Sequence, residues 1–100
     1  MTFSTWLDRH TAAAPPVLRA RVHEHARAVP AEGPRPVVLA AAAHGALDRV
    51  LSHPGDRSVA LDLLAADALI TLALLAQAQE SPANLGGFAA SLVQAARPGT

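Results

Sequence analysis

The sequence predicts an all-α fold, a compact four- to five-helix bundle with a central apolar helix. No segment alternates β-branched and polar residues as a half-buried strand does. Prolines, among them Pro16, Pro36 and Pro82, divide the chain into segments whose apolar residues recur at helical spacing. One of these segments is apolar on every side, which is typical of a helix that is buried all round.

The composition indicates a single helical domain over residues 1–100. Hydrophobic residues are 51% of the chain and 24 of them are alanine, which favours closely approaching helix axes. Eight arginines balance eight acidic residues, so no net positive charge is available to hold a nucleic-acid backbone. The chain has no cysteine, which excludes disulfides, thiolate metal sites and thiol nucleophiles.

The first two helices are expected at residues 3–10 and 16–29. Phe3, Trp6 and Leu7 lie at i, i+3 and i+4, so they share one face of the first helix. A helix of this length is not stable alone, and Trp6 is therefore expected to dock against other helices. Pro16 suits the first turn of the second helix, where its missing N–H has no partner to lose.

The third and fourth helices are expected at residues 37–53 and 57–79, separated by the stop sequence His53-Pro54-Gly55. Asp56 is a candidate N-cap for the fourth helix. Leucines lie on every side of that helix, so it is expected at the centre of the bundle. The residues expected to be nearly inaccessible are Leu61, Leu64, Leu69, Ile70, Leu72 and Leu75.

The fifth helix is expected at residues 83–96, after a Ser81-Pro82 start. Gly86-Gly87 leaves two alternatives open. In the first alternative, the helix begins after Gly87, because each glycine weakens a helix by about 1 kcal/mol relative to alanine. Alternatively, the two glycines lie within the helix and allow close contact with an alanine-rich neighbour.

Two carboxylates interrupt the apolar fourth helix. Asp62 and Asp67 lie about 140° apart around the helix, so they cannot form one acid–base pair. Asp62 is within two turns of the helix start, where partial exposure is expected. Asp67 is near the middle with Thr71 one turn later, which predicts a buried polar patch at Asp67 and Thr71. A buried carboxylate needs a partner, and arginine is the only permanent cation in the chain.

The sequence contains no catalytic constellation, and we expect no enzyme activity. His23 and His25 are two residues apart and point away from each other, so they do not form a helical zinc motif. His44 and Asp48 have the spacing of a base and its orienting acid, but no nucleophile completes the set. We therefore predict no catalytic residue, no metal ligand and no cofactor. No motif identifies a family.

The sequence favours a function by protein–protein association, as a homodimer or as a subunit or adaptor of a larger assembly. The fourth helix, about 34 Å long, is too long for its shorter neighbours to cover completely, so part of its apolar surface is expected to be exposed. The expected contact is formed by Leu72, Leu74, Leu75 and Ala78. The alternative is a bundle that binds a small apolar ligand or lipid between its helices.

The expected partner is therefore a second copy or another protein. The two aspartates argue against insertion of the fourth helix into a membrane. The first ten residues have no basic leader followed by a long apolar run, so no secretory signal is predicted and the cytoplasm is the expected location.

Overall fold

The computed structural model describes residues 1–96, which form five α-helices and one short 3-10 helix and contain no strand. The predicted all-α bundle is therefore confirmed. The elements in chain order are α1 (Phe3–His10), α2 (Pro16–Arg27), α3 (Arg35–Ser52), α4 (Ser58–Glu80), η1 (Pro82–Asn84) and α5 (Leu85–Ala96).

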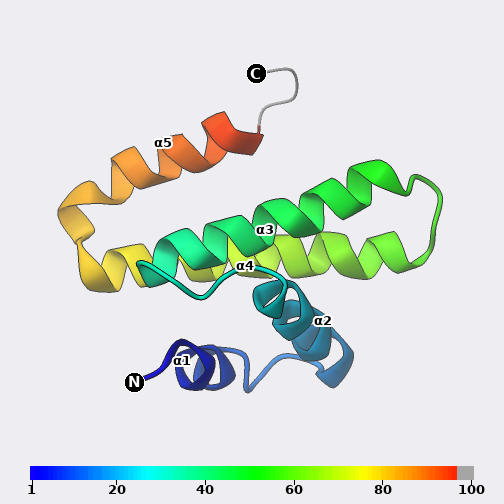
Figure 1. Cartoon of the computed structure of the whole chain (residues 1–100), viewed down its shortest axis with the longest axis horizontal. Helices are drawn as coiled ribbons and strands as arrows, with labels where there is room; N and C mark the ends of the chain where they lie inside the picture. Colours follow the sequence, from blue (N-terminus) through cyan, green and yellow to red (C-terminus); the bar gives the residue numbers. More distant parts are fainter. Residues whose placement is uncertain (97–100) are drawn as a thin grey trace.

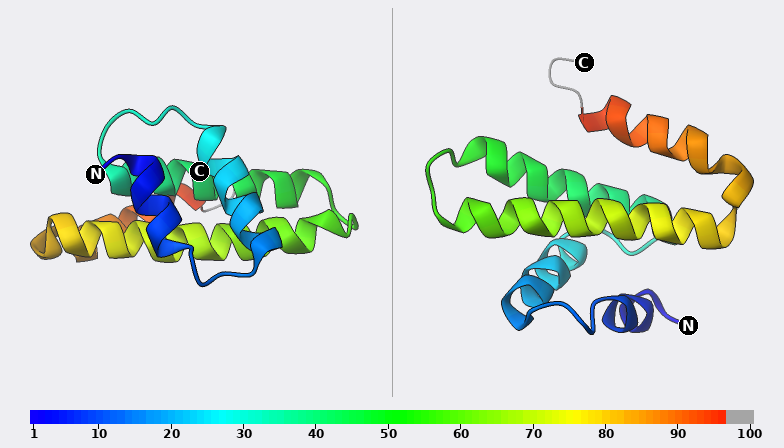
Figure 2. Two further views of the ribbon diagram at one scale, coloured as in Figure 1. Left: turned by 90° about the horizontal axis from the view of Figure 1, so that it is seen from below. Right: turned by 180° about the vertical axis from the view of Figure 1, so that it is seen from behind.

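The long helices α3 and α4 form an antiparallel hairpin that extends through the middle of the molecule (Figure 1). Helices α1 and α2 lie on one side of this hairpin, and α5 lies on the other. The view from behind shows the same order (Figure 2). Helix α4 contacts α2, α3, η1 and α5, and its contact with α3 is the most extensive between any two elements.

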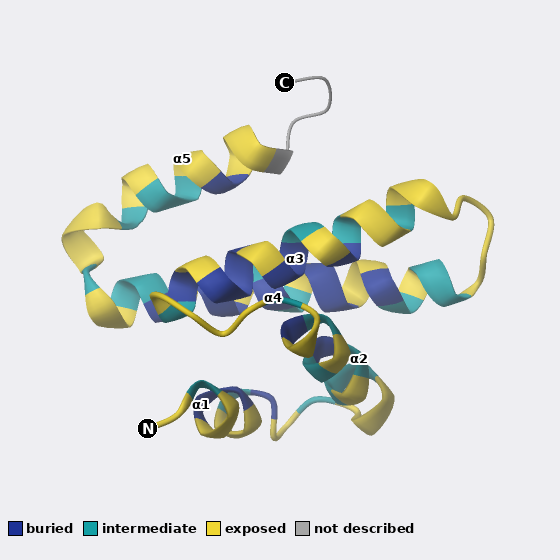
Figure 3. Cartoon of the chain, in the orientation of Figure 1, coloured by how far each residue is buried: buried dark blue, intermediate teal, exposed yellow. Residues whose placement is uncertain are grey.

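Small side chains form the contact between α3 and α4. Alanine at contact positions lets two helix axes approach closely, toward the near end of the usual range of about 8–10 Å. The buried residues are concentrated where the two helices meet (Figure 3). The buried alanines of the hairpin are Ala40, Ala42, Ala43, Ala46, Ala65, Ala66, Ala73 and Ala76.

The leucine core expected for α4 is only partly correct. Leu69 and Leu72 are buried, but Leu64 and Leu75 are 56% and 39% exposed. Leu61 and Ile70 are half-buried. A helix that is apolar on every side has no hydrophobic periodicity to fix its rotation, so the close packing of alanines against α3 decides which side is buried.

Helix α1 docks through Trp6, as expected. The indole is buried, and its Nε1 donates a hydrogen bond to Oε1 of Gln79 near the end of α4 at 3.2 Å. The indole also stacks on the ring of His10, with centroids 4.0 Å apart, and the guanidinium of Arg35 lies over it at 5.2 Å. Leu7 beside it is buried in the same core. An apolar ring with a satisfied N–H thus attaches a helix that is too short to be stable alone.

The segment boundaries differ from expectation in small ways. Helix α3 begins two residues early, because Pro36 is tolerated in a first turn. Both Gly86 and Gly87 lie within α5, but the expected close contact with an alanine-rich neighbour is wrong, because a Cβ at either position would meet nothing within 4 Å. The turn before α4 requires Gly55, whose φ of 85° is in the left-handed region. The N-cap of α4 is Arg57 rather than the expected Asp56, and it forms no side-chain cap hydrogen bond. Asp56, one residue earlier, accepts hydrogen bonds from the backbone N–H and hydroxyl of Ser58 at the start of the helix.

Candidate functional site

The most buried charge in the described residues is the carboxylate of Asp62 on α4, which is 0% exposed. Its Oδ1 accepts hydrogen bonds from Nη1 of Arg21 at 2.7 Å and from Nε2 of His25 at 2.8 Å. Its Oδ2 accepts one from Nε of Arg49 at 2.8 Å. We call these four residues the Asp62 cluster. It joins α2, α3 and α4 through one side chain.

The electrostatics of the Asp62 cluster favour the ionised carboxylate. Burial by itself raises the pKa of Asp62 and is the largest single effect. The hydrogen bonds from Arg21, His25 and Arg49 together outweigh burial, so the net pKa lies below the usual range of a carboxyl group. The hydrogen bond to Asp62 in turn raises the pKa of Arg21. Both carboxylate oxygens have donors, so the arrangement suits a structural ion pair rather than proton transfer.

The expected buried polar patch at Asp67 and Thr71 is wrong. Both side chains are exposed, and the hydroxyl of Thr71 donates to the backbone carbonyl of Asp67 at 3.0 Å. The expected partial exposure of Asp62 is also wrong, and both errors have one cause, the rotation of α4 about its axis. The two aspartates lie on opposite sides of α4, and the side packed against α2 and α3 is that of Asp62.

The sequence did not identify Arg21, His25 and Arg49 as the partners of Asp62. Arg21 and His25 are spaced i, i+4 and therefore lie on one face of α2. That spacing shows that the two side chains can share a partner, but the partner on α4 is 41 residues away from Arg21 in the chain. Only the crossing of α2 over the hairpin brings these groups together.

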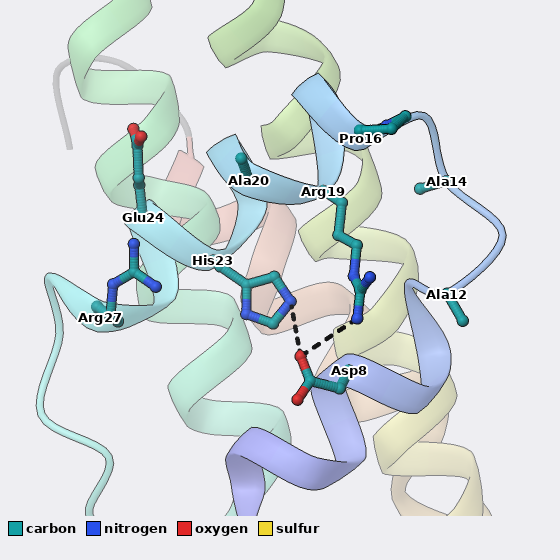
Figure 4. A pocket seen from close by; sticks show the side chains of 9 residues that line it. All are labelled: Asp8, Ala12, Ala14, Pro16, Arg19, Ala20, His23, Glu24 and Arg27. Carbon is teal, nitrogen blue, oxygen red and sulfur yellow. Dashed lines mark ion pairs between the residues drawn. The ribbon is translucent and has the colours of Figure 1, made fainter.

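Two of the hollows beside α1 and α2 are the second candidate. One, of about 430 Å³, is lined by both helices and their connection, and there Asp8 faces Arg19 at 3.5 Å and His23 at 3.3 Å (Figure 4). The other, of about 450 Å³, includes the apolar side chains of Phe3, Leu7 and Val29. His44 and Asp48 lie on α3, and neither belongs to the Asp62 cluster or to these hollows.

The solvent side of α4 is the third candidate. We call it the outward face, and its members are exposed or half-buried: Ala60, Leu63, Leu64, Asp67, Thr71, Leu74, Leu75 and Ala78. Three of the four expected contact residues belong to it, since Leu75 is exposed and Leu74 and Ala78 are half-buried. Leu72 does not belong to it, because it is buried in the core of the chain. Leu63 and Leu64, which are 51% and 56% exposed, extend the face into the first half of the helix.

Two further structural facts bear on the choice among these sites. Within residues 1–96, no group of three or more His, Asp or Glu side chains has an arrangement suited to a metal ion. Helix α4 is long and apolar enough to cross a membrane by length and composition, a test that the core helices of soluble proteins also pass.

The comparisons with known proteins leave the function to be argued from this geometry. No protein family, no curated protein and no solved structure matches the chain.

Proposed function

We propose that this protein acts by association with another protein chain through the outward face of α4, as a homodimer or as a subunit of a larger assembly. The observation that supports the proposal is the distribution of side-chain size around α4. Four of the leucines, Leu63, Leu64, Leu74 and Leu75, are on the outward face. The side packed in the bundle has mainly alanine.

This distribution is unfavourable for an isolated chain. Burying a leucine side chain contributes about 1.5–3 kcal/mol, and the chain forgoes much of that at Leu63, Leu64 and Leu75. Single exposed leucines are common on protein surfaces, but two leucine pairs on one helix face, Leu63–Leu64 and Leu74–Leu75, are typical of an interaction surface. The zero net charge of the chain offers no general electrostatic barrier to self-association.

Two alternative functions compete with this proposal. Insertion of α4 into a membrane would separate Asp62 from Arg21, His25 and Arg49, and would leave a carboxylate in hydrocarbon. Binding of a small apolar ligand would use the hollow beside Phe3, Leu7 and Val29 instead of the outward face. Saturable binding of an apolar fluorescent dye that is abolished by Val29→Arg would favour this second reading.

The proposal is tested by placing a charge on the outward face. Leu64→Arg should lower the mass measured by light scattering after size exclusion, while circular dichroism remains that of the wild type. Leu51→Arg is the matched control, because Leu51 is 73% exposed but lies on α3. If both variants keep the mass of the wild type, or if the wild type is monomeric and captures no other chain through this face, the proposal fails.

A further inference from the structure

The outward face of α4 has the spacing of a coiled-coil seam. Its central positions alternate steps of four and three residues, which is the a/d pattern of the heptad repeat. Leu63 and Leu75 flank the seam. The central positions are Ala60, Leu64, Asp67, Thr71, Leu74 and Ala78.

We infer that a second copy of this chain packs its α4 antiparallel on this seam, with the two-fold axis at the level of Leu69. The inference rests on the proposed function and names the partner and its direction. In a two-fold interface the same patch from both copies must complement itself, so residue i meets residue j and j meets i. An antiparallel helix pair meets this condition when the positions equally far before and after the axis fit one another.

The seam satisfies this condition in every layer. Nine residues before and after position 69 stand Ala60 and Ala78, and five residues before and after it stand Leu64 and Leu74. The flanking leucines, Leu63 and Leu75, are each six residues from the same centre. The antiparallel arrangement therefore places leucine beside leucine on both sides of the polar central layer, and alanine beside alanine beyond the leucines.

The central layer decides between the two directions. In a parallel pair each position meets itself, so the Asp67 carboxylates of the two copies would face each other inside an apolar seam, which is unfavourable. In the antiparallel pair, Asp67 lies opposite the partner's Thr71, because Asp67 and Thr71 are each two residues away from position 69. The two carboxylates are then about 6 Å apart along the helix, at about 1.5 Å per residue. The exposed hydroxyl of Thr71 donates to the backbone carbonyl of Asp67 in the single chain, and it can rotate to donate to the partner carboxylate instead.

Most of the outward face is exposed. Seen from behind, α4 lies in front of α3 and no other helix crosses it, while the connection between α1 and α2 lies beside it (Figure 2). Asp67 and Thr71 at the middle of the seam are both exposed, as are Ala60 and Leu64 in its first half. The side chains that set the direction are therefore accessible to a second copy.

Because the chain contains no cysteine, single introduced cysteines report the direction of the pair without background. The variants Leu64→Cys and Leu74→Cys are prepared separately. They are then mixed at a concentration at which the wild type is dimeric, and oxidised mildly. A disulfide needs Cα atoms within about 7 Å. The antiparallel pair brings position 64 level with position 74 of the partner, but separates position 64 from its own copy by about 15 Å.

The expected result is a disulfide-linked dimer in the mixture and almost none in either variant alone. The mixed dimer retains one intact Leu64–Leu74 layer, and each variant is first shown by sedimentation to remain dimeric. Efficient linkage of each variant with itself would indicate a parallel pair and overturn the inference. A third outcome is that no sample forms a disulfide although Leu64→Arg still dissociates the dimer. That outcome would overturn the inferred antiparallel register but leave the proposed function standing. A monomeric wild type would overturn the inference, and it would overturn the proposed function as well if the outward face captures no other chain.

Discussion

Arg49 near the end of α3 and Asp62 in the second turn of α4 are joined across the hairpin, with Nε of the arginine 2.8 Å from Oδ2 of the aspartate. The same carboxylate accepts from Arg21 and His25 of α2 through its other oxygen. One side chain thus ties together the three helices that contribute most of the core. The stability of the bundle should therefore depend strongly on Asp62.

Asp62→Asn should destabilise the protein by about 2–4 kcal/mol. The amide retains the shape of the carboxylate but removes the negative charge that Arg49 and Arg21 share, leaving Arg21 paired with Glu24 alone. Breaking a buried pair usually costs about 3–5 kcal/mol. The value is reduced here because Arg21 and Arg49 reach solvent. Urea unfolding followed by circular dichroism measures the change. Asp67→Asn, on the exposed side of the same helix, should change stability by less than about 0.5 kcal/mol. Equal effects of the two variants would contradict the assigned role of Asp62.

The contribution of Asp62 should disappear in acid. Its folded-state pKa lies below the usual value of about 3.9, so the contribution is fully present above that pH and is lost as the pH falls through the folded-state pKa. The difference in free energy of unfolding between the wild type and Asp62→Asn should be fully present at about pH 5. It should narrow below about pH 4. A difference that widens as the pH falls below about 4 would contradict the lowered pKa of Asp62.

Leucines on the two sides of α4 should respond differently to truncation. Leu69→Ala should cost about 2–5 kcal/mol, because Leu69 is 0% exposed and its removal leaves a cavity. Leu64→Ala should cost the monomer less than about 1 kcal/mol, because Leu64 lies on the outward face. Chemical denaturation at low protein concentration compares the two without a contribution from association. A larger loss for Leu64→Ala would place that residue in the core.

Trp6 should report the docking of α1. Gln79→Leu removes the acceptor of the indole N–H and should cost about 1–3 kcal/mol, since a buried donor then has no partner. Because Trp6 is the only tryptophan, its emission measures this contact directly. We expect emission at longer wavelength and faster acrylamide quenching, with the helix content unchanged. An unaltered spectrum and quenching rate would show that α1 docks without this hydrogen bond.

The sequence predicted the helices well because prolines and apolar spacing mark their ends. It did not predict which side of α4 is buried, since leucines on all sides give no preferred rotation. The 140° between Asp62 and Asp67 showed that the two could not share a site on the helix, but not which one is buried. That choice depends on alanine packing between α3 and α4 and on the crossing of α2, neither of which leaves a local signal.

The residues of the outward face were predicted only in part, again because the rotation of α4 could not be predicted. The excess length of α4 correctly indicated exposed apolar surface, and Leu74, Leu75 and Ala78 lie on the outward face. The assignment of Leu72 to the contact was wrong, because Leu72 lies on the side of α4 that packs in the core. Leu64 was expected in the core, and Leu63 was assigned to neither the core nor the contact, because leucines on every side of the helix give no preferred rotation. Once the rotation of α4 is known, the seam follows from residue spacing alone.

Sedimentation equilibrium of the wild type over a wide concentration range tests the central claim, self-association through the outward face of α4, most directly. We expect a mass of twice the 10.3 kDa chain at high concentration, falling toward the chain mass on dilution. Leu64→Arg should stay at the chain mass throughout, and Leu51→Arg should follow the wild type. A wild type that remains at 10.3 kDa up to the highest concentration, or a dimer that Leu64→Arg leaves intact, would contradict the claim.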